Sequence, residues 1–273
     1  MWSPTPPKGE KMNGKKILKI ISVPLSLLFW IAVWAIISLR VSNEFLLPSP
    51  KDTLTALFAM VRESEFWIIT ASSLLRILFG IVIAAILGVI LGVITARLEM
   101  LDSLFSPLMT LVKATPIASF IVLALLWIDR NTLPVFITVL IVLPIVHSNI
   151  SSGIRSVKKE LLQVAKVYRF SPSKKLLKIY VPSVLPFFLA ACRASLGMAW
   201  KAGIAAEVLC TPKDAIGTQI YFSKTYLETP DLFAWTLIVI ILSVVIEKLL
   251  LLGITSVIKR LHVSGKEDGN AEA

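Results

Sequence analysis

The sequence has few charged residues: Asp, Glu, Lys and Arg make up only 16% of it, where a soluble domain carries about a quarter. Long apolar runs take their place, and 56% of the 273 residues are hydrophobic. A membrane-spanning helix needs roughly 20 mostly apolar residues, and several segments reach that length. The composition therefore predicts an all-α integral membrane protein.

Other absences narrow the chemistry. The chain has no Gly-x4-Gly-Lys-Ser/Thr phosphate loop, so any ATP must be hydrolysed by another chain. His147 has no second His or Cys nearby, and the spans hold no paired carboxylates and no His-Glu-x-x-His run, so we predict no metal, no cofactor and no catalytic residue. Cys192 and Cys210 would lie about 27 Å apart along one helix, which is too far for a disulfide.

Apolar runs predict six transmembrane helices. A polar, Pro- and Lys-rich tail over residues 1–16 is predicted to be disordered. The first run, 17–39, is expected to be an anchor, because it is longer than a signal-peptide core and no small-residue cleavage site follows it. The six runs are Ile17–Leu39, Ile68–Ala96, Pro107–Ile128, Pro134–Gly153, Ser183–Cys210 and Leu232–Thr255.

The basic residues predict an orientation. The net charge is +11, and most Lys and Arg outside the spans fall on one side if the N-terminus is cytoplasmic. Because cytoplasmic loops concentrate Lys and Arg, we expect both termini to be cytoplasmic, with residues 255–273 as the second tail. No basic stripe is interleaved with exposed aromatics, so we predict no nucleic-acid partner.

The segment 155–182, between the fourth and fifth runs, is amphipathic and basic. Leu161, Val164, Ala165 and Tyr168 fall on one face of a predicted helix. The segment is either an interfacial loop attracted to anionic membrane lipid or a docking element for a soluble partner.

A second short helix is predicted after this one. Ser171 and Pro172 form an N-cap followed by Pro at the first helical position. The helix, Lys174–Tyr180, is expected to stop before Pro182.

This segment resembles the cytoplasmic coupling loop of ABC importer permeases, whose pattern is Glu-Ala-Ala, three residues, Gly, nine residues, Ile, one residue, Leu-Pro. The spacing is kept, and Arg169 replaces the Gly, which implies a different or a strained turn. Replacing Ala165 with Arg should then uncouple transport. The matching positions are Gln163, Val164, Ala165, Arg169, Ile179, Val181 and Pro182.

Motifs outside the loop resemble the nitrate/sulfonate/taurine branch of the same permeases. The resemblance implies the type-I ABC importer permease fold over residues 66–254, in a multi-pass protein of the plasma (inner) membrane. It also implies ATP-binding ATPase subunits, an extracytoplasmic substrate-binding protein and a homodimer of permeases as partners. The motifs are Leu47-Pro-Ser-Pro50, Ser73-Leu-Leu-Arg76, Gly80, Gly88, Gly92, Ala114-Thr-Pro116, Trp200, Ala206-Glu207, Ile216-Gly217 and Thr229–Trp235.

Four charged residues within the predicted spans are candidates for the translocation path: Lys113, Arg193, Lys201 and Glu207. Such residues are costly in lipid and usually face a bundle interior or a wet cavity. A cationic lining would suit a small anionic or sulfonate-like solute. Alternatively the cations are tethers near the span ends. Glu207 would then be a structural partner of a cation, for example Lys201, and Arg76 would reach the outer interface.

Further residues are predicted to shape the helices. Gly88 and Gly92 form a small-xxx-small pattern that allows close helix approach, and Pro116 and Pro144 are expected to kink their helices. Residues 211–231 are expected to contain a short outer helix or an interfacial belt.

The sequence also allows other functions. An ion-coupled secondary carrier would use Glu207 as its relay and would depend on an ion gradient rather than on ATP. A membrane enzyme would need a convergent catalytic set, which the spans lack. A pure scaffold would leave the loop spacing unexplained.

Overall fold

The computed structural model describes the backbone of residues 14–41, 43 and 45–270, and the side chains of residues 24–41, 43 and 45–253. Within these residues the chain is helical throughout and contains no strand. The helices are α1 (Gly14–Val41), α2 (Pro50–Val61), α3 (Ser64–Arg97), α4 (Glu99–Ala114), α5 (Ile117–Ala124), α6 (Leu133–Arg155), α7 (Lys159–Val167), α8 (Pro172–Lys175), a π-helical turn (Leu176–Tyr180), α9 (Val181–Cys210), α10 (Ile216–Thr225) and α11 (Thr229–Asn270).

Five helices in the described residues, α1, α3, the α8–α9 run, α6 and α11, are long and apolar enough to cross a membrane. The pair α4 and α5 gives a sixth passage if it counts as one span. The predicted span over Pro107–Ile128 corresponds to this pair, in which the two helices are bent by 103°. Thr115 is extended there, as the residue before a proline tends to be, and Pro116 ends the hydrogen-bond ladder as predicted.

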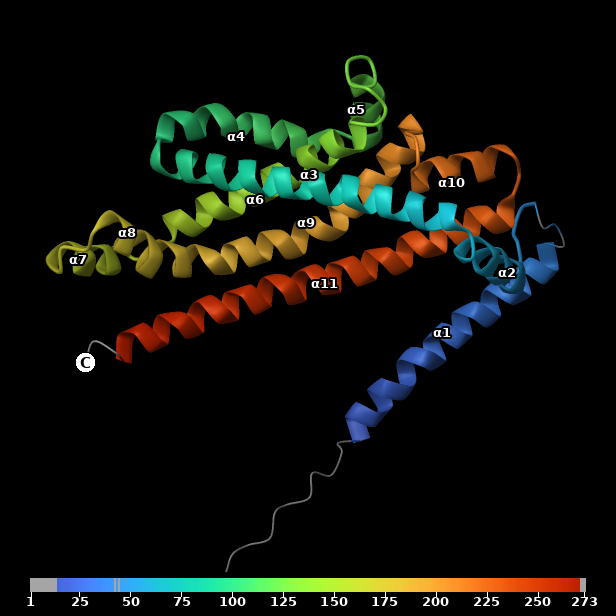
Figure 1. Cartoon of the computed structure of the whole chain (residues 1–273), viewed down its shortest axis with the longest axis horizontal. Helices are drawn as coiled ribbons and strands as arrows, with labels where there is room; N and C mark the ends of the chain where they lie inside the picture. The colour runs from blue at the N-terminus through green and yellow to red at the C-terminus, as the bar shows by residue number, and fades with distance from the viewer. Residues whose placement is uncertain (1–13, 42, 44, 271–273) are drawn as a thin grey trace, which may run out of the picture.

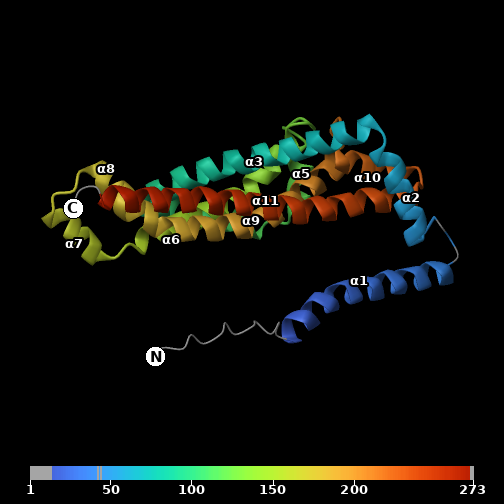
Figure 2. The same ribbon diagram turned by 60° about the horizontal axis from the view of Figure 1, so that its bottom comes forward.

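The long helices alternate in direction. Figure 1 shows α1, α4 and α9 running toward the end of the molecule that carries α2 and α10, while α3, α6 and α11 run back toward α7 and α8. Figure 2 shows α7 and α8 beyond the end of the bundle. We call the two ends the α10 end and the loop end.

Close packing of α3 against α6 depends on glycines in α3. A Cβ atom at Gly88 would lie 2.7 Å from the Cβ of Val146, and one at Gly92 would lie 2.8 Å from the Cβ of Ile150. Both distances are shorter than real contacts allow, so the helices approach closely only without side chains here. The predicted packing role of these glycines is confirmed.

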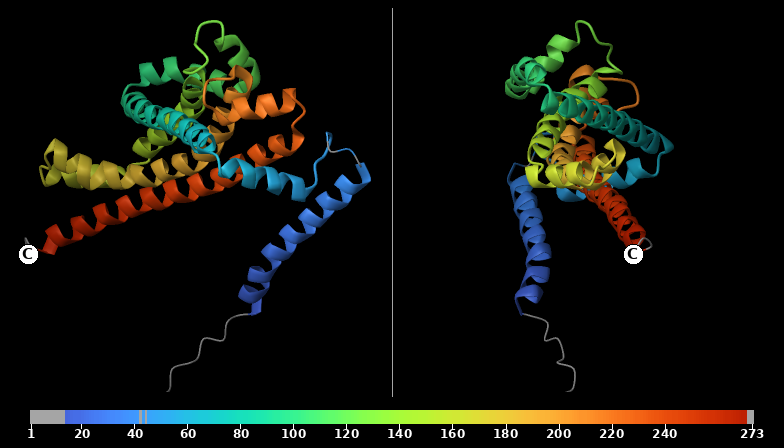
Figure 3. Two further views of the ribbon diagram at one scale, coloured as in Figure 1. Left: turned by 45° about the vertical axis from the view of Figure 1, so that its right-hand side comes forward. Right: turned by 90° about the vertical axis from the view of Figure 1, so that its left-hand side faces the viewer.

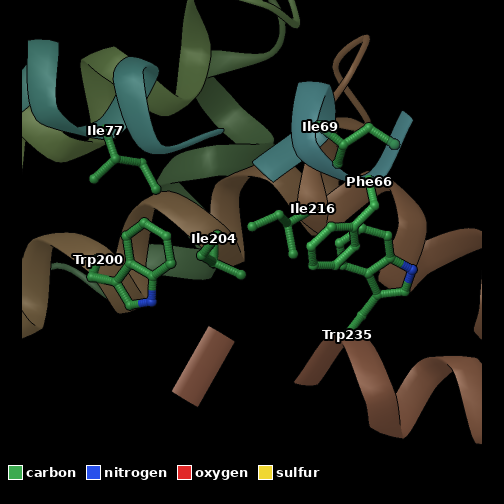
Figure 4. Close-up of a cluster of buried hydrophobic side chains, with 7 residues drawn as sticks. All are labelled: Phe66, Ile69, Ile77, Trp200, Ile204, Ile216 and Trp235. Atoms are coloured by element: carbon green, nitrogen blue, oxygen red, sulfur yellow. The ribbon is translucent and has the colours of Figure 1, made fainter. Parts of the chain in front are cut away.

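At the α10 end, aromatic and aliphatic side chains from α3, α9, α10 and α11 form one core (Figure 4). The rings of Phe66 and Trp235 stack with centroids 5.2 Å apart. The indole of Trp200 donates to the carbonyl of Val239 at 3.0 Å, which ties α9 to α11. The buried members are Phe66, Ile69, Ile77, Trp200, Ile204, Ile216 and Trp235.

Helix α1 diverges from this bundle, as Figures 1 and 3 show. It is attached near its C-terminal end, where Trp34 Nε1 donates to the carbonyl of Pro48 at 3.1 Å and Ser38 Oγ to that of Leu47 at 3.1 Å. The predicted turn before α2 is confirmed, with Ser49 and Asp52 forming a capping box. Most of the apolar side chains described in α1, those of residues 24–41, are exposed, as suits contact with lipid or with another apolar surface.

Residues 1–13 of the predicted N-terminal tail and residues 271–273 of the predicted C-terminal tail fall outside the described residues. Helix α1 begins at Gly14, before the predicted start of the first span, and α11 continues to Asn270 with no break near residue 255, so most of the predicted C-terminal tail lies within this helix. The division into tails and a domain over 66–254 stays a prediction.

Candidate functional site

The segment between α6 and α9 has its own small core. Ala165, Ile179 and Val157 are buried there, with exposed fractions of 3%, 6% and 8%, and Phe170 and Tyr180 pack against them. The core holds α7 against the start of the α8–α9 run. The loop is therefore a folded element with a fixed shape.

The turn between α7 and α8 carries a strained residue. Arg169 has a φ of 47°, in the left-handed region that costs roughly 1–2 kcal/mol for a residue with a Cβ. The amide of Phe170 donates to the carbonyl of Ala165 at 2.9 Å, which closes the helix end. The expectation of an unusual turn at Arg169 is confirmed. Ser171 also caps α8 as predicted, accepting from the amide of Lys174.

The predicted helix stop before Pro182 is wrong. The chain continues as one helical run from Pro172 to Cys210. A widened π-helical turn precedes the proline, and the amide of Val181 donates to the carbonyl of Leu176, five residues back. Such a turn relaxes the clash that a proline ring makes with the preceding turn of an α-helix.

The pattern positions in the loop divide into two groups. Ala165 and Ile179 lie in the small core, whereas Gln163, Val164, Arg169 and Pro182 are exposed. Beside them the structure exposes two apolar side chains, Val167 at 77% and Tyr168 at 73%.

Glu207 is fully buried, and α3 supplies its partners. Arg76 Nη1 donates to Glu207 Oε1 at 2.7 Å, and Ser73 Oγ donates to Oε2 at 2.8 Å. The amide of Gly217 in α10 also donates to Oε2, at 3.2 Å. The second guanidinium nitrogen of Arg76 donates to the carbonyl of Lys213 at 3.1 Å.

These contacts join α3, α9 and α10 into one unit, which we call the clamp: Ser73, Arg76, Glu207 and Gly217. Glu207 is the structural partner of a cation, as predicted, but that cation is Arg76 rather than Lys201, because Glu207 faces α3 while Lys201 is exposed on another side of α9. The prediction for Arg76 is wrong. Arg76 turns inward and is only 13% exposed, instead of reaching the outer interface.

An exposed stripe of α9 carries two of the other candidates. Arg193 and Lys201 lie on it with Gly197 between them, and a Cβ at Gly197 would meet nothing within 4 Å. Lys201 lines a cavity of about 360 Å³ whose apolar walls come from α5, α6 and α9. This stripe thus combines small residues, two cations and a hollow.

Lys113 and Glu207 are placed differently. Lys113 is exposed on α4, and its Nζ donates to Ser148 Oγ at 3.4 Å. Glu207 belongs to the clamp and points away from the exposed stripe of α9. The structure therefore does not bring the four predicted path residues together. The sequence does not predict that Ser73 and Gly217 bind Glu207. Ser73 stands in the same motif as Arg76, and Gly217 stands in the motif that follows Glu207, but only the folded structure brings them to the carboxylate.

Comparison with known proteins gives a consistent result. Residues 84–262 match the family described as binding-protein-dependent transport system inner membrane component. The chain is 28% identical over 233 residues to a bicarbonate transport system permease protein of Synechococcus elongatus, covering 79% of this chain and 81% of that protein.

Two other relatives are similar over most of their length. A putative aliphatic sulfonates transport permease protein of Bacillus subtilis is 26% identical over 211 residues, 76% of each chain. The taurine transport system permease protein of Escherichia coli is 23% identical over 271 residues, 93% of this chain and 95% of that protein.

Proposed function

The chain belongs to the family of binding-protein-dependent transport system inner membrane components. On that premise we propose which parts of this permease subunit of an ATP-driven importer couple transport to ATP hydrolysis and which parts contact the solute. The subunit is a multi-pass protein of the inner membrane that works with ATP-binding subunits on separate chains and with a substrate-binding protein. We assign coupling to the loop between α6 and α9, and the path to the exposed stripe of α9.

The observation that carries the coupling assignment is the folded loop at the end of the bundle. Its small core supports an outward surface with Val167 and Tyr168 exposed among basic side chains. Exposed tyrosine and arginine side chains are typical anchors of protein interfaces, and an exposed valine beside them adds apolar area that a partner can bury. In this proposal the loop lies in the cytoplasm, where the ATP-binding subunit docks on it.

Val167→Asp should reduce co-purification of the ATP-binding subunit at least tenfold and abolish uptake, because a charge would be buried in the interface. The purified permease should keep its melting temperature, since Val167 is 77% exposed. Pull-down of the tagged permease with quantitative mass spectrometry measures the loss.

Tyr226→Asp is the matched control: it is the same kind of change at a side chain 67% exposed near α10, and it should leave the ATP-binding subunit in place. Equal retention by Val167→Asp and the unmodified protein would contradict the assignment. Ala165→Arg is a poorer test, because Ala165 is only 3% exposed and the change would disrupt the core of the loop.

The solute we propose is a small oxoanion. The relatives are named for bicarbonate, aliphatic sulfonates and taurine, each of which carries an oxyanion group. Lys201 at the hollow between α5, α6 and α9 would supply a positive charge in an apolar surrounding. A positive charge attracts an anion more strongly there than in water, because the dielectric constant is lower. Arg193 and Lys113 would extend the cationic surface, which a second copy of the chain would enclose.

Lys201→Met should lower uptake about tenfold or more, as expected for loss of a charged hydrogen bond worth roughly 1.5–3 kcal/mol. Lys201 is exposed, so the melting temperature should not fall. Uptake of bicarbonate, taurine and nitrate into proteoliposomes with the full transporter tests this. Lys201→Arg should retain uptake, and unchanged uptake in Lys201→Met would remove Lys201 from the path.

The alternative of an ion-coupled carrier using Glu207 gains no support. Both carboxylate oxygens of Glu207 already accept hydrogen bonds, from Arg76 on one side and from Ser73 and Gly217 on the other. A relay needs a group that can exchange its proton with a wet path, and Glu207 is fully buried.

A further inference from the structure

An apolar groove lies at the loop end of the bundle, between the last turns of α3 and α6 and the first turns of α9. Its volume is about 360 Å³. Val89 and Val93 of α3, Ile154 of α6, and Val184 and Phe188 of α9 line it. Among the described residues, Arg97 is the one charged side chain in the lining, and it stands with Tyr180 at the loop end of the groove.

Nearer the α10 end, α11 packs against α9, one of the helices that form the groove. There, Val239, Leu242 and Ile246 of α11 pack against the core formed by α3 and α9. None of the described side chains of α11 is among those that line the groove.

Two cationic side chains, Arg97 and Lys175, lie at the mouth of the groove. A second hollow, which shares Arg97, Leu176 and Tyr180 with the groove, adds Ser173 and Lys175. Lys175 Nζ lies 5.8 Å from the centroid of the Tyr180 ring, a cation–π contact that holds it beside the opening. In the part of the chain that the structure describes, the ion pairs are Arg76–Glu207 and Arg155–Asp102, so neither Arg97 nor Lys175 is neutralised there.

We propose that this groove binds one anionic phospholipid per chain. An acyl chain would occupy the space between α3, α6 and α9, and the phosphate would contact Arg97 and Lys175, with the Ser173 hydroxyl in the same hollow. Basic pockets between transmembrane helices on the cytoplasmic side are suited to anionic headgroups. The orientation of this end follows from the proposed function, but the chemistry of the groove does not depend on it.

The combination of features selects a lipid over other anions. A free phosphate could pair with Arg97 and Lys175, but it would leave the apolar groove below them filled with water, which apolar walls disfavour. An acidic protein surface could pair with the cations without entering the groove. Only a molecule with an anionic head and an apolar tail fills the groove and also pairs with the cations. The exposed side chains of Leu176 and Val181 form an apolar edge to the groove.

The test is native mass spectrometry of the full-length permease in detergent, titrated with phosphatidylglycerol and with phosphatidylcholine of the same acyl chains. We expect one phosphatidylglycerol per chain to be retained in preference to phosphatidylcholine. The double variant Arg97→Gln/Lys175→Gln should weaken this binding about 30-fold, since each basic residue near an anionic lipid contributes about a factor of five.

Two controls separate this site from a general attraction to basic loops. Lys159→Gln/Lys166→Gln removes the same charge from exposed positions on α7 and should leave binding unchanged. Val93→Phe fills the groove and should release the lipid while keeping both cations; Val184→Phe serves if the first variant does not fold. Equal losses in the two double variants, undiminished binding after the groove is filled, or displacement by excess inorganic phosphate would each overturn the proposal.

Discussion

Replacing Arg76 with methionine is expected to destabilise the folded protein by about 3–5 kcal/mol, the usual result of removing one partner of a buried ion pair. Glu207 has no exposed surface, and Arg76 is the cation that neutralises it, at 2.7 Å. The remaining donors, Ser73 and the Gly217 amide, are neutral and cannot balance a full charge in the interior. Thermal and denaturant unfolding of the purified permease in detergent measures the loss.

A double-mutant cycle and a second ion pair serve as controls. Arg76→Met/Glu207→Gln should recover most of the stability, because the uncompensated charge is removed with its partner. Arg155→Met breaks a pair whose side chains are 49% and 29% exposed, so we expect a loss of no more than about 1 kcal/mol. A melting temperature of Arg76→Met equal to that of the unmodified protein would contradict the role of the clamp.

Gly217→Ala should have the second-largest effect on folding stability. We expect it to lower the free energy of unfolding by about 3 kcal/mol, at the upper end of the usual cost of overpacking. The new Cβ would lie 2.4 Å from the Cβ of Glu207 and 2.4 Å from the backbone nitrogen of Val208. Neither atom belongs to a flexible end of a side chain, so α10 itself must move. That movement would also break the hydrogen bond from the Gly217 amide to Glu207, and the same unfolding assay would detect both losses.

Gly253→Ala provides the comparison, because a Cβ there meets nothing within 4 Å. In a helix this change should be neutral or stabilising by roughly 0.5–1 kcal/mol. Similar destabilisation by Gly217→Ala and Gly253→Ala would mean that the close approach of α10 to α9 does not limit stability.

Local sequence features predicted much of the fold. The turn before α2, the cap at Ser171, the break at Pro116 and the packing of Gly88 against α6 each depend on residues close in the chain or on one small residue. The family resemblance rests on motifs of the same local kind, and membership in the family confirms it.

The wrong predictions have different physical causes. Arg76 and Glu207 are 131 positions apart, and their pairing depends on which faces of α3 and α9 meet, which no local pattern specifies. The stop before Pro182 was expected from the usual effect of proline, but the π-helical turn accommodates the ring. The break between α4 and α5 is predicted by Pro116, whereas the proline alone does not specify the angle of 103°.

The unbroken run from Pro172 to Cys210 joins the second half of the loop and the fifth span into one rod of 39 residues, about 58 Å long at 1.5 Å per residue. The clamp fixes this rod near one end, at Glu207. If the rod pivots there, its arm to Pro172 is about 52 Å and its arm to Lys201 about 9 Å. A shift imposed at the loop would then arrive at Lys201 reduced about sixfold. In the proposed function, such a rod would act as a reducing lever that converts a large displacement at the loop into a small displacement beside the proposed solute path.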